Sequence, residues 1–337
     1  MLQIEKNFTL HGLNTFHIEA SCNFFTRVTN IDDLKEAIRF SDFKKLPVFV
    51  LGGGSNILFT RNFNGFVIQP CLQEISQTGD DGNYIYLKVG AGIEWDKLVE
   101  LTVDNEWGCL ENLSLIPGHV GACSIQNIGA YGAEVKDSIV QVECVNLDNA
   151  ETFSLTNNQC QFAYRTSIFK KELAGKVIIT NVTFRLSRKI KLNISYGSVA
   201  DELKKFPEIN IKTVRQAVIN IRRKKLPDPE LIGNAGSFFK NPVIQSSHVL
   251  KIKHDYPDLP EYQISEHESK IPAAYLIEKC GWKGYRIGDA GVYPGQPLVL
   301  VNYGKAKGEE LLKLSENIVH SVHEKFGITL EREINIV

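Results

Sequence analysis

The run Asn112-Leu-Ser-Leu-Ile-Pro-Gly-His-Val-Gly-Ala-Cys-Ser-Ile-Gln-Asn-Ile-Gly-Ala-Tyr-Gly132 contains no charged side chain, although 23% of the residues in the chain are charged. Glycines and Pro117 interrupt the run, so it cannot form one continuous helix or strand. Interleaved Asn, Gln, Ser and His residues argue against a membrane span. Two interpretations follow. The run is either irregular backbone that lets a large, partly anionic ligand approach closely, or a buried connection between two sheets.

Length and composition describe an ordinary globular protein. The 337 residues are enough for two or three domains, and 43% of them are hydrophobic without a long unbroken apolar segment. A net charge of −1 gives no general attraction to nucleic acid or to an anionic membrane. The N-terminus shows no secretory signal, and the seven cysteines lack a Cys-x-x-Cys spacing, which suits free thiols in a reducing compartment. We therefore expect a cytoplasmic enzyme or binding protein.

A second glycine-rich stretch, Gly52-Gly-Gly-Ser-Asn56, follows a short buried strand that we predict at residues 46–51. Glycine lets consecutive backbone N–H groups turn toward an anion, so this stretch is either a phosphate cradle or a plain tight turn. No Gly-Lys-Ser/Thr follows it, which excludes a P-loop. The pattern Gly-x-Gly-x-x-Gly is also absent, so a Rossmann domain has no support.

The remaining elements mix helices and strands without the regular alternation of a doubly wound sheet, so the expected fold class is α+β. Apolar periodicity predicts helices at residues 30–42, 94–107, 211–226, 272–280 and 305–326. It predicts further strands at residues 84–89, 139–147, 151–155, 161–164, 177–186, 297–302 and 328–337.

The end of the predicted helix at 211–226 carries a basic run, Arg222-Arg-Lys-Lys225, followed by Pro227 and Pro229. The two prolines suggest a domain junction. The basic run has three interpretations: a solvated helix end, a nucleic-acid patch, for which it is short, or a site for a phosphorylated substrate.

Few residues outside the glycine-rich stretches point to chemistry. His320 and His323 share a helix face with Glu, Ser and Lys, which favours an exposed surface, and we predict no metal site. Cys123 has no activating partner close to it in the sequence. What remains is the Tyr164-Arg165 pair and the loop Gly233-Asn-Ala-Gly-Ser-Phe-Phe-Lys-Asn-Pro242. The pattern favours a phosphate-containing ligand on the first half of the chain and a polar reaction site facing the second half.

Five segments in a fixed order resemble the UDP-N-acetylenolpyruvoylglucosamine reductase family, over residues 14–333. They are Leu51-Gly-Gly-Gly-Ser-Asn56, residues 116–132 of the run quoted first, Tyr164-Arg-Thr-Ser167, Lys225-Leu-Pro-Asp-Pro229 and residues 233–242. The resemblance implies an α+β fold with an FAD-binding domain of the vanillyl-alcohol-oxidase (PCMH) type in two subdomains, plus a C-terminal α+β substrate-binding domain. The implied boundaries are residues 1–70 and 71–226 for the two FAD-binding subdomains, 227–326 for the substrate-binding domain and 327–337 for a closing strand with the catalytic glutamate. The chain looks like the longer family type, in which a tyrosine-bearing loop closes over the substrate.

The implied activity is NADPH-dependent reduction of UDP-N-acetylglucosamine enolpyruvate to UDP-N-acetylmuramate, in bacterial peptidoglycan precursor biosynthesis. The implied cofactor is non-covalent FAD, and NADPH is the co-substrate. By the same resemblance, flavin N5 would deliver hydride to the enolpyruvyl C3 and Ser237 would give a proton to C2. No nucleic-acid or membrane partner is implied, and we expect a monomer in the bacterial cytoplasm.

The functional positions of the family carry over residue by residue. The implied catalytic residues are Arg165, Ser237 and Glu333. The implied cofactor-binding residues are Gly52, Gly53, Gly54, Ser55, Asn56, Pro117, Gly118, Gly121, Ala122, Cys123, Ser124, Ile128, Gly129 and Tyr131. The implied substrate-binding residues are Tyr164, Tyr196, Lys225, Asn241, Tyr262, Lys283 and Gln296.

These implied roles have a chemical rationale. An uncharged, glycine-rich wall would not repel the FAD diphosphate. Arg165 would bind the substrate carboxylate and stabilise an enolate, which the Ser237 hydroxyl would protonate. Glu333 would help only as a neutral acid, so we expect a raised pKa for its carboxyl group. Arg332 stands where the family usually has proline, and Glu331 remains an alternative because it shares a strand face with Glu333.

Two other interpretations remain. A flavin oxidase of the same wider fold, acting on another alcohol or sugar, would not depend on NADPH and would not need Lys225 or Ser237. A nucleotide-sugar binding module without chemistry would have lost one of the three catalytic candidates, and all three are present.

Overall fold

The computed structural model describes residues 2–337 and groups them into two units. The first unit contains Ser21–Gly54, Phe63–Lys224 and the residues up to Phe8. The second contains Thr9–Ala20, Ser55–Asn62 and Lys225–Val337. Two short segments from the N-terminal part of the chain therefore belong with the C-terminal residues.

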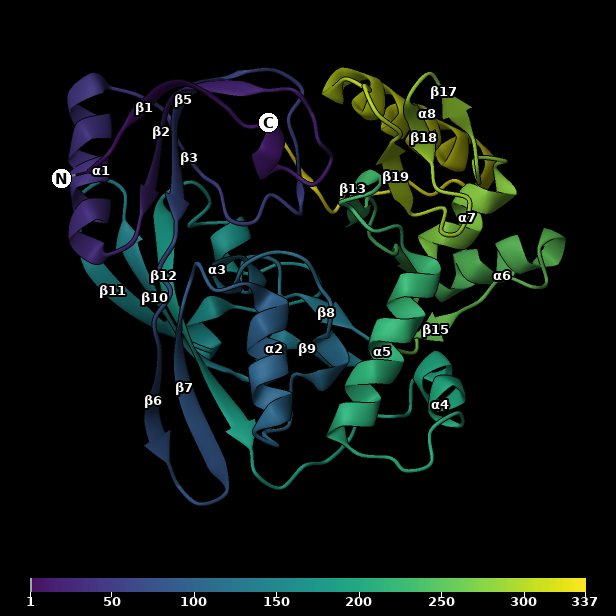
Figure 1. Cartoon of the computed structure of the whole chain (residues 1–337). Coiled ribbons are helices and arrows are strands. Elements are labelled where there is room, and N and C mark those ends of the chain that lie inside the picture. The colour runs from purple at the N-terminus through teal and green to yellow at the C-terminus, as the bar shows by residue number, and fades with distance from the viewer. Residues whose placement is uncertain (1) are drawn as a thin grey trace. The chain divides into compact units, whose positions relative to one another are not determined.

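A four-stranded sheet and helix α1 (Ile31–Lys44) begin the first unit. The strand order is β1 (Glu5–Thr9), β2 (Ser21–Val28), β5 (Phe63–Pro70) and β3 (Val48–Val50), and β5 runs parallel to both β2 and β3. The helix starts where the sequence predicts, because the Asn30 side chain accepts a hydrogen bond from the Asp33 N–H at 2.8 Å. It ends at left-handed Lys45. The buried face of α1 covers β2 and β5 (Figure 1).

The second sheet of this unit is antiparallel and has five strands. Their order is β11 (Thr152–Thr156), β10 (Ile139–Asn146), β12 (Val177–Ser187), β7 (Tyr84–Gly90) and β6 (Ile75–Asp80). Helix α2 (Trp95–Asp104) packs on this sheet, and the ring centroids of Trp95 and Phe184 are 6.0 Å apart. The helix is shorter than the predicted 94–107 because Glu106 adopts a left-handed φ of 56°.

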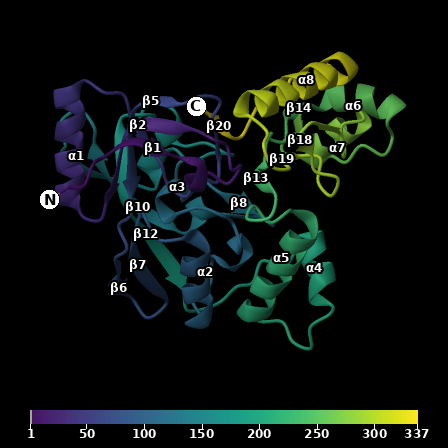
Figure 2. The same ribbon diagram turned by 45° about the horizontal axis from the view of Figure 1, so that its top comes forward.

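Helices α4 (Gly197–Leu203) and α5 (Ile211–Lys225) form a pair. They lie side by side in two views (Figure 1, Figure 2), and Val199, Leu203, Val214 and Val218 share one apolar cluster. The buried residues of α5 recur with the helical spacing predicted from the sequence. The shorter elements of the first unit are α3 (Val120–Cys123), β8 (Gly129–Ala130), β9 (Ala133–Glu134) and the 3-10 helices η2 (Glu111–Leu113), η3 (Val135–Asp137), η4 (Asn158–Cys160) and η5 (Ile168–Lys170).

The second unit contains two larger sheets, a two-stranded pair and three α-helices among its described elements. One sheet has the order β13 (Gly233–Ser237), β19 (Val299–Asn302), β18 (Ala290–Val292) and β17 (Arg286–Ile287). The other has the order β14 (Val243–Gln245), β16 (Glu268–Lys270) and β15 (Tyr262–Gln263), and β4 (Ile57–Leu58) pairs with β20 (Asn335–Ile336). The helices are α6 (Ser246–Asp255), α7 (Ala273–Lys279) and α8 (Gly308–Phe326), with the 3-10 helix η1 (His11–Leu13). Helix α8 contacts β18 and β19.

The side chain of Asn302 shows why residues 9–20 belong to the second unit. It is 3% exposed, and its Nδ2 donates to the Phe16 carbonyl at 2.8 Å. Its Oδ1 accepts from the N–H groups of Gly304 and Ala306, both at 2.9 Å. This buried amide therefore links residues 9–20 to residues 302–306, which directly precede α8.

Two predicted strands differ in the structure. Residues 161–164 form a turn, because Gln161 adopts a left-handed φ of 49° and Ala163 bridges only to Thr166. The closing strand predicted at 328–337 is a strand only at β20, with one bridge between Arg332 and Phe239. The segment changes partner from residues 238–240 to residues 56–58, so one continuous ladder does not form.

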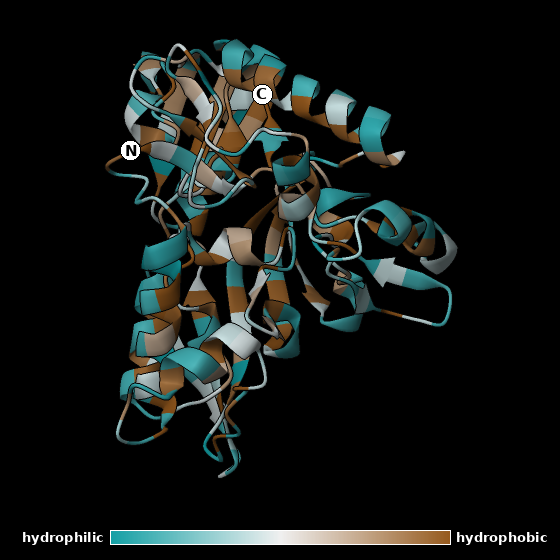
Figure 3. Cartoon of the chain, turned by 90° about the vertical axis from the view of Figure 1, so that its right-hand side faces the viewer, coloured by the Kyte–Doolittle hydropathy of each residue, from teal (hydrophilic) through white to brown (hydrophobic). Residues whose placement is uncertain are grey.

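The helices carry alternating hydrophilic and hydrophobic bands (Figure 3). Such bands are typical of helices that bury one face and expose the other. Within the described residues, no helix combines the length and the apolar character that crossing a membrane requires.

Glu111, which precedes the uncharged run, should make the stability of the first unit depend on pH. Its side chain is 3% exposed, and burial raises the pKa of its carboxyl group above the ordinary value of 4.5. The folded state then binds more protons than the unfolded state, so this contribution to stability is full below the unfolded pKa and is lost as the pH rises through the folded pKa. As the pH rises from about 4, the wild type should lose stability that Glu111→Gln keeps. The free energy of unfolding of the variant should therefore increase relative to that of the wild type.

Urea denaturation at a series of pH values measures this difference. Glu172→Gln is the control, because it makes the same substitution at an exposed glutamate of the same unit. A stability difference for Glu111→Gln that stays constant with pH would show that Glu111 is charged in the folded protein.

Candidate functional site

The uncharged run forms irregular backbone that is anchored in the core. It passes from η2 through the single turn α3 to the hairpin of β8 and β9. Leu115, Asn127 and Tyr131 have positive φ angles of 58°, 49° and 49°, which residues other than glycine rarely adopt. Val120 and Cys123 are buried, and α3 contacts β7 and β12. The run therefore combines the irregular backbone expected of a ligand site with a firm attachment to the second sheet.

The two glycine-rich stretches meet within the first unit. A Cβ atom on Gly53 would lie 2.9 Å from the Gly118 Cα atom and 3.3 Å from the His119 Cδ2 atom, so a side chain at residue 53 requires a backbone shift. A Cβ atom on Gly52 would lie 3.8 Å from the Ala122 Cβ atom, an ordinary contact. Both stretches contribute backbone to one small surface, as a shared phosphate cradle requires.

Backbone donors collect at this meeting point. In the part of the chain that the structure describes, the N–H groups of Gly52, Gly53, Gly118 and His119 have no hydrogen-bond partner. The buried Nδ1 atom of His119 also lacks one there, and burial lowers the pKa of its imidazole, which favours the neutral ring. Unpaired N–H groups on glycine-rich backbone bind anions such as a diphosphate. The surface therefore fits the cofactor group that the sequence predicts for it.

The guanidinium group of Arg165 lies against the other half of the run. Its Nη2 donates to the Gly129 carbonyl at 2.5 Å and its Nη1 to the Asn127 carbonyl at 3.5 Å. The ring centroid of Tyr164 is 5.3 Å from the guanidinium carbon. A Cβ atom on Gly129 would lie 2.9 Å from Nη1 and 3.0 Å from the Ala133 carbonyl oxygen, so a side chain at residue 129 would require the guanidinium group to shift. The structure thus brings Arg165 and Tyr164 to residues predicted to line the flavin.

Asn127 is a site residue that was not predicted from the sequence. Its fully buried Nδ2 donates to Glu134 Oε2 and to the Ala163 carbonyl, both at 3.1 Å. Its Oδ1 accepts from the Lys136 N–H at 3.1 Å. Because Ala163 belongs to the turn that carries Arg165, Asn127 joins this turn to the uncharged run. The one sequence signal was an asparagine, a residue rarely found fully buried, inside a run without charges.

In the second unit, Ser237 and Glu333 lie on neighbouring segments. Ser237 ends β13 and pairs with Val299. The Glu333 N–H donates to the carbonyl of the next residue, Phe238, at 2.8 Å, and Asn56 Nδ2 donates to the Glu333 carbonyl at 3.5 Å. Two catalytic candidates and one cofactor-binding candidate from distant parts of the chain are therefore brought together. Arg165 belongs to the first unit.

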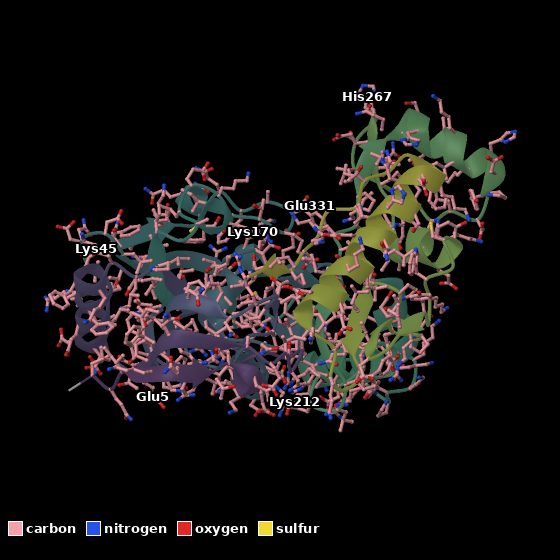
Figure 4. The ribbon with its side chains drawn as sticks, turned by 90° about the horizontal axis from the view of Figure 1, so that it is seen from above. Glu5, Lys45, Lys170, Lys212, His267 and Glu331 are labelled. Atoms are coloured by element: carbon pink, nitrogen blue, oxygen red, sulfur yellow. The ribbon has the colours of Figure 1, made fainter. Side chains whose placement is uncertain are left out.

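The alternative glutamate, Glu331, is engaged at the surface. Its carboxylate pairs with the ammonium group of Lys240, and its side chain is 71% exposed. Figure 4 labels its position in the C-terminal part of the chain. The Lys240 N–H also donates to the Glu331 carbonyl at 2.9 Å. These contacts engage the exposed Glu331 carboxylate with a lysine whose side chain is mostly buried.

The substrate-binding candidates are divided between the units. Tyr164 and Tyr196 belong to the first unit, and Lys225, Asn241, Tyr262, Lys283 and Gln296 belong to the second. No hydrogen bond or ion pair within residues 2–337 joins any two of the five in the second unit. Asn241 Oδ1 caps α7 by accepting from the Ala273 N–H at 3.0 Å, and Lys283 pairs with Glu278 at 2.9 Å. Tyr262 is 55% exposed.

Metal and thiol chemistry have little support among the described residues. No group of His, Cys, Asp or Glu within them is arranged to hold a metal ion. His320 pairs with Glu324 at 3.2 Å, and the ring of His323 bonds to the Thr329 hydroxyl at 3.1 Å. Burial raises the pKa of the Cys123 thiol, so this group is inert packing rather than a nucleophile.

Two family descriptions match separate parts of the chain. Residues 23–156 match the FAD binding domain family. Residues 228–337 match the family described as UDP-N-acetylenolpyruvoylglucosamine reductase, C-terminal domain. Fold and site thus define the class of the protein, an FAD-binding oxidoreductase. The expected α+β class, with an FAD-binding domain and a reductase C-terminal domain, is confirmed.

Individual relatives extend the match to the full length. The UDP-N-acetylenolpyruvoylglucosamine reductase of Flavobacterium johnsoniae is 44% identical over 339 residues, and that of Amoebophilus asiaticus is 42% identical over 338, with 100% of each chain covered. A crystal structure of the reductase from Thermus caldophilus aligns with a TM-score of 0.70 at 23% identity, covering 100% of this chain and 99% of that one, which shows a shared fold. The chain belongs to the UDP-N-acetylenolpyruvoylglucosamine reductase family, the flavoprotein oxidoreductases of peptidoglycan precursor synthesis.

Gly53→Ala should weaken FAD binding about 5- to 150-fold, because an overpacked contact costs about 1–3 kcal/mol and separating the two loops would relieve it. Gly12→Ala is the matched control, since its Cβ atom would meet nothing within 4 Å and its φ is not positive. The ratio of flavin absorbance to protein absorbance gives the FAD content of each variant. Titration of the flavin-free protein with FAD gives its affinity. Equal FAD affinity of Gly53→Ala and Gly12→Ala would contradict a cofactor role for this contact.

Proposed function

We propose that the protein uses NADPH and non-covalent FAD to reduce UDP-N-acetylglucosamine enolpyruvate to UDP-N-acetylmuramate. Its full-length similarity to reductases named for this substrate supports the activity. The contact of the Arg165 guanidinium with the Gly129 carbonyl carries the proposal, because it holds a group suited to a carboxylate at residues that would line the flavin.

The cofactor would be held by the two glycine-rich stretches. Residues 52–56 and 117–124 would bind its pyrophosphate, mainly through backbone N–H groups. Ile128, Gly129 and Tyr131 would lie along its isoalloxazine ring. When bound, FAD supplies the electron pair taken from NADPH to C3 of the enolpyruvyl group.

Arg165 would bind the carboxylate of the substrate. Its two contacts with backbone carbonyls orient the plane of the guanidinium before the substrate arrives. An oriented cation stabilises the negative charge that spreads over C2 and the carboxylate, without having to reorganise during the reaction. Asn127 supports this orientation, because it holds both the turn of Arg165 and one of the carbonyls that Arg165 contacts.

Ser237 would transfer its hydroxyl proton to C2. A serine is a weak acid in water, but an enolate is basic enough to take its proton when the hydroxyl is positioned. Glu333 would assist as a neutral carboxylic acid, because a carboxylate would repel the enolate. The surface ion pair between Glu331 and Lys240 supports assigning this role to Glu333.

The nucleotide part of the substrate would be recognised by tyrosine, lysine and amide side chains. These are Tyr164, Tyr196, Lys225, Asn241, Tyr262, Lys283 and Gln296. Tyr196 directly precedes α4, and its ring packs edge-on against Tyr131 with 5.5 Å between the ring centroids. A loop that carries an exposed tyrosine suits the longer family type, in which such a loop closes over the substrate. We expect the protein to act as a monomer in the bacterial cytoplasm.

The spectrum of the purified protein tests the activity. Bound flavin should absorb in the visible range, and NADPH should bleach this absorbance when oxygen is absent. UDP-N-acetylglucosamine enolpyruvate should then restore the absorbance, whereas UDP-N-acetylglucosamine should not. A protein without flavin absorbance would overturn the proposal. Bleaching of the flavin by another alcohol or sugar, followed by reoxidation by oxygen and with no response to NADPH, would favour the oxidase.

Ser237→Ala should separate the two half-reactions. Bleaching by NADPH should stay unchanged, and reoxidation by substrate should slow about 100- to 10,000-fold, as expected when a positioned proton donor is lost. Ser237→Cys keeps a donor and should recover part of the rate. Stopped-flow absorbance follows both steps, and an equal slowing of both would rule out a role confined to proton transfer.

Glu333→Gln and Glu331→Gln form a matched pair in the closing segment. Glu333→Gln should slow the reoxidation step, because the amide has no acidic proton to share with the enolate. Glu331→Gln should leave it nearly unchanged, because the Glu331 side chain is exposed and its carboxylate is engaged by Lys240. The same stopped-flow measurement compares them. If Glu333→Gln keeps most of its activity, Glu333 is not the residue that stabilises the enol.

A further inference from the structure

Arg222 behaves differently from the rest of the basic run at the end of α5. Arg223, Lys224 and Lys225 are exposed, as a solvated helix end predicts. Arg222 instead turns into the first unit, where its Nε donates to the Leu115 carbonyl at 3.1 Å. Its guanidinium group also interacts electrostatically with the Tyr131 side chain.

Leu115 is held on both sides in an unusual backbone conformation. Its φ of 58° lies in the left-handed region, which disfavours a leucine unless its surroundings impose it. Its N–H donates to Asp96 Oδ1 at 2.5 Å, while its carbonyl accepts from Arg222. Asp96 is itself fixed by Arg215, whose two Nη atoms bind the two carboxylate oxygens at 2.7 and 3.0 Å.

Helix α5 therefore fixes the backbone of Leu115, the residue just before the pyrophosphate half of the run. Arg215 and Arg222 are seven residues apart in the sequence, so they lie on one face of the helix. One reaches the Leu115 N–H through Asp96, and the other reaches the Leu115 carbonyl directly. Gly118, which meets Gly53, follows three residues after Leu115.

Tyr131 stands at the opposite end of the run, in the half predicted to line the flavin. Its φ is 49°, and its carbonyl accepts from Asn112 Nδ2 at 3.0 Å. The electrostatic interaction of Tyr131 with Arg222 places this arginine between the two halves, with a hydrogen bond to Leu115 on one side and Tyr131 on the other. Arg222 is mostly removed from solvent, and a buried guanidinium is tolerated only when such partners replace water.

We infer that Arg222 is a positioning residue of the cofactor site, which holds the pyrophosphate loop and the flavin-side residue Tyr131 at a set separation so that FAD meets both halves preformed. The inference rests on the proposed assignment of residues 112–132 to FAD. Arg222 acts through Leu115 and Tyr131 and takes no part in the chemistry.

Release of FAD from the holoenzyme tests this role, with flavin fluorescence recorded after dilution. Arg222→Met should release FAD about 10- to 100-fold faster than the wild type, as expected for the loss of a charged, partly buried hydrogen-bond donor. Arg222→Lys keeps the charge but cannot span both partners, so its rate should lie between them. Arg223→Met removes the same charge from an exposed neighbour and should change the rate by less than about twofold.

Tyr131→Phe removes the hydroxyl group of Tyr131 and so tests its interaction with Arg222 alone. It should speed release less than Arg222→Met does, and the double variant should release FAD no faster than Arg222→Met alone, because both changes break one connection. The visible flavin band should shift in the Arg222 and Tyr131 variants and stay unchanged in Arg223→Met. If Arg222→Met fails to fold, as circular dichroism would show, Arg222→Lys and Tyr131→Phe carry the test.

Equal FAD release from Arg222→Met and Arg223→Met would overturn the inference, and so would fully additive effects in the double variant. A wild-type protein that binds no FAD would overturn the proposed function instead. The two failures are therefore distinguishable.

Discussion

The close backbone contact between Gly53 and Gly118 is the constraint on which the first unit depends. Gly53 follows β3 of the first sheet, and Gly118 precedes α3, which packs on the second sheet. The two sheets share an apolar cluster, since Val145 and Ile178 of the second pack with the residues that bury α1. This shared core keeps two short stretches, distant in the sequence, at a separation that excludes a side chain. The backbone donors between them exist as a group only while that packing holds.

The uncharged run is fixed by charged side chains that belong to other segments of the chain. Asp96, Arg215 and Arg222 bind the backbone of Leu115, and Arg165 binds the carbonyls of the flavin-side half. This arrangement keeps carboxylates out of the surface that would meet a diphosphate, yet still uses strong, charge-assisted hydrogen bonds to fix an irregular backbone. Rigid loops of this kind depend on such contacts because they lack a continuous ladder of their own.

Local signals identified most of the regular elements and failed where the chain turns without glycine. α1 starts at the asparagine with which the predicted helix begins, and α5 follows its apolar period, because both signals arise from residues within one or two turns. The strand expected at 161–164 is a turn, since nothing local marks Gln161 as left-handed. The closing strand breaks because its alternating residues change pairing partner, and the partner lies far away in the sequence.

The sequence by itself determined the family, the fold class and the uncharged, glycine-rich surfaces, because these depend on residue type and order alone. Only the tertiary structure decided that Arg222 turns inward while Arg223 stays in solvent, and that Glu331 is engaged by Lys240. It alone showed that Asn127 ties the turn of Arg165 to the run. Neighbouring residues of the same type received different roles because each role depends on a group from a distant segment. Packing brings that group into reach, and a local pattern carries no record of it.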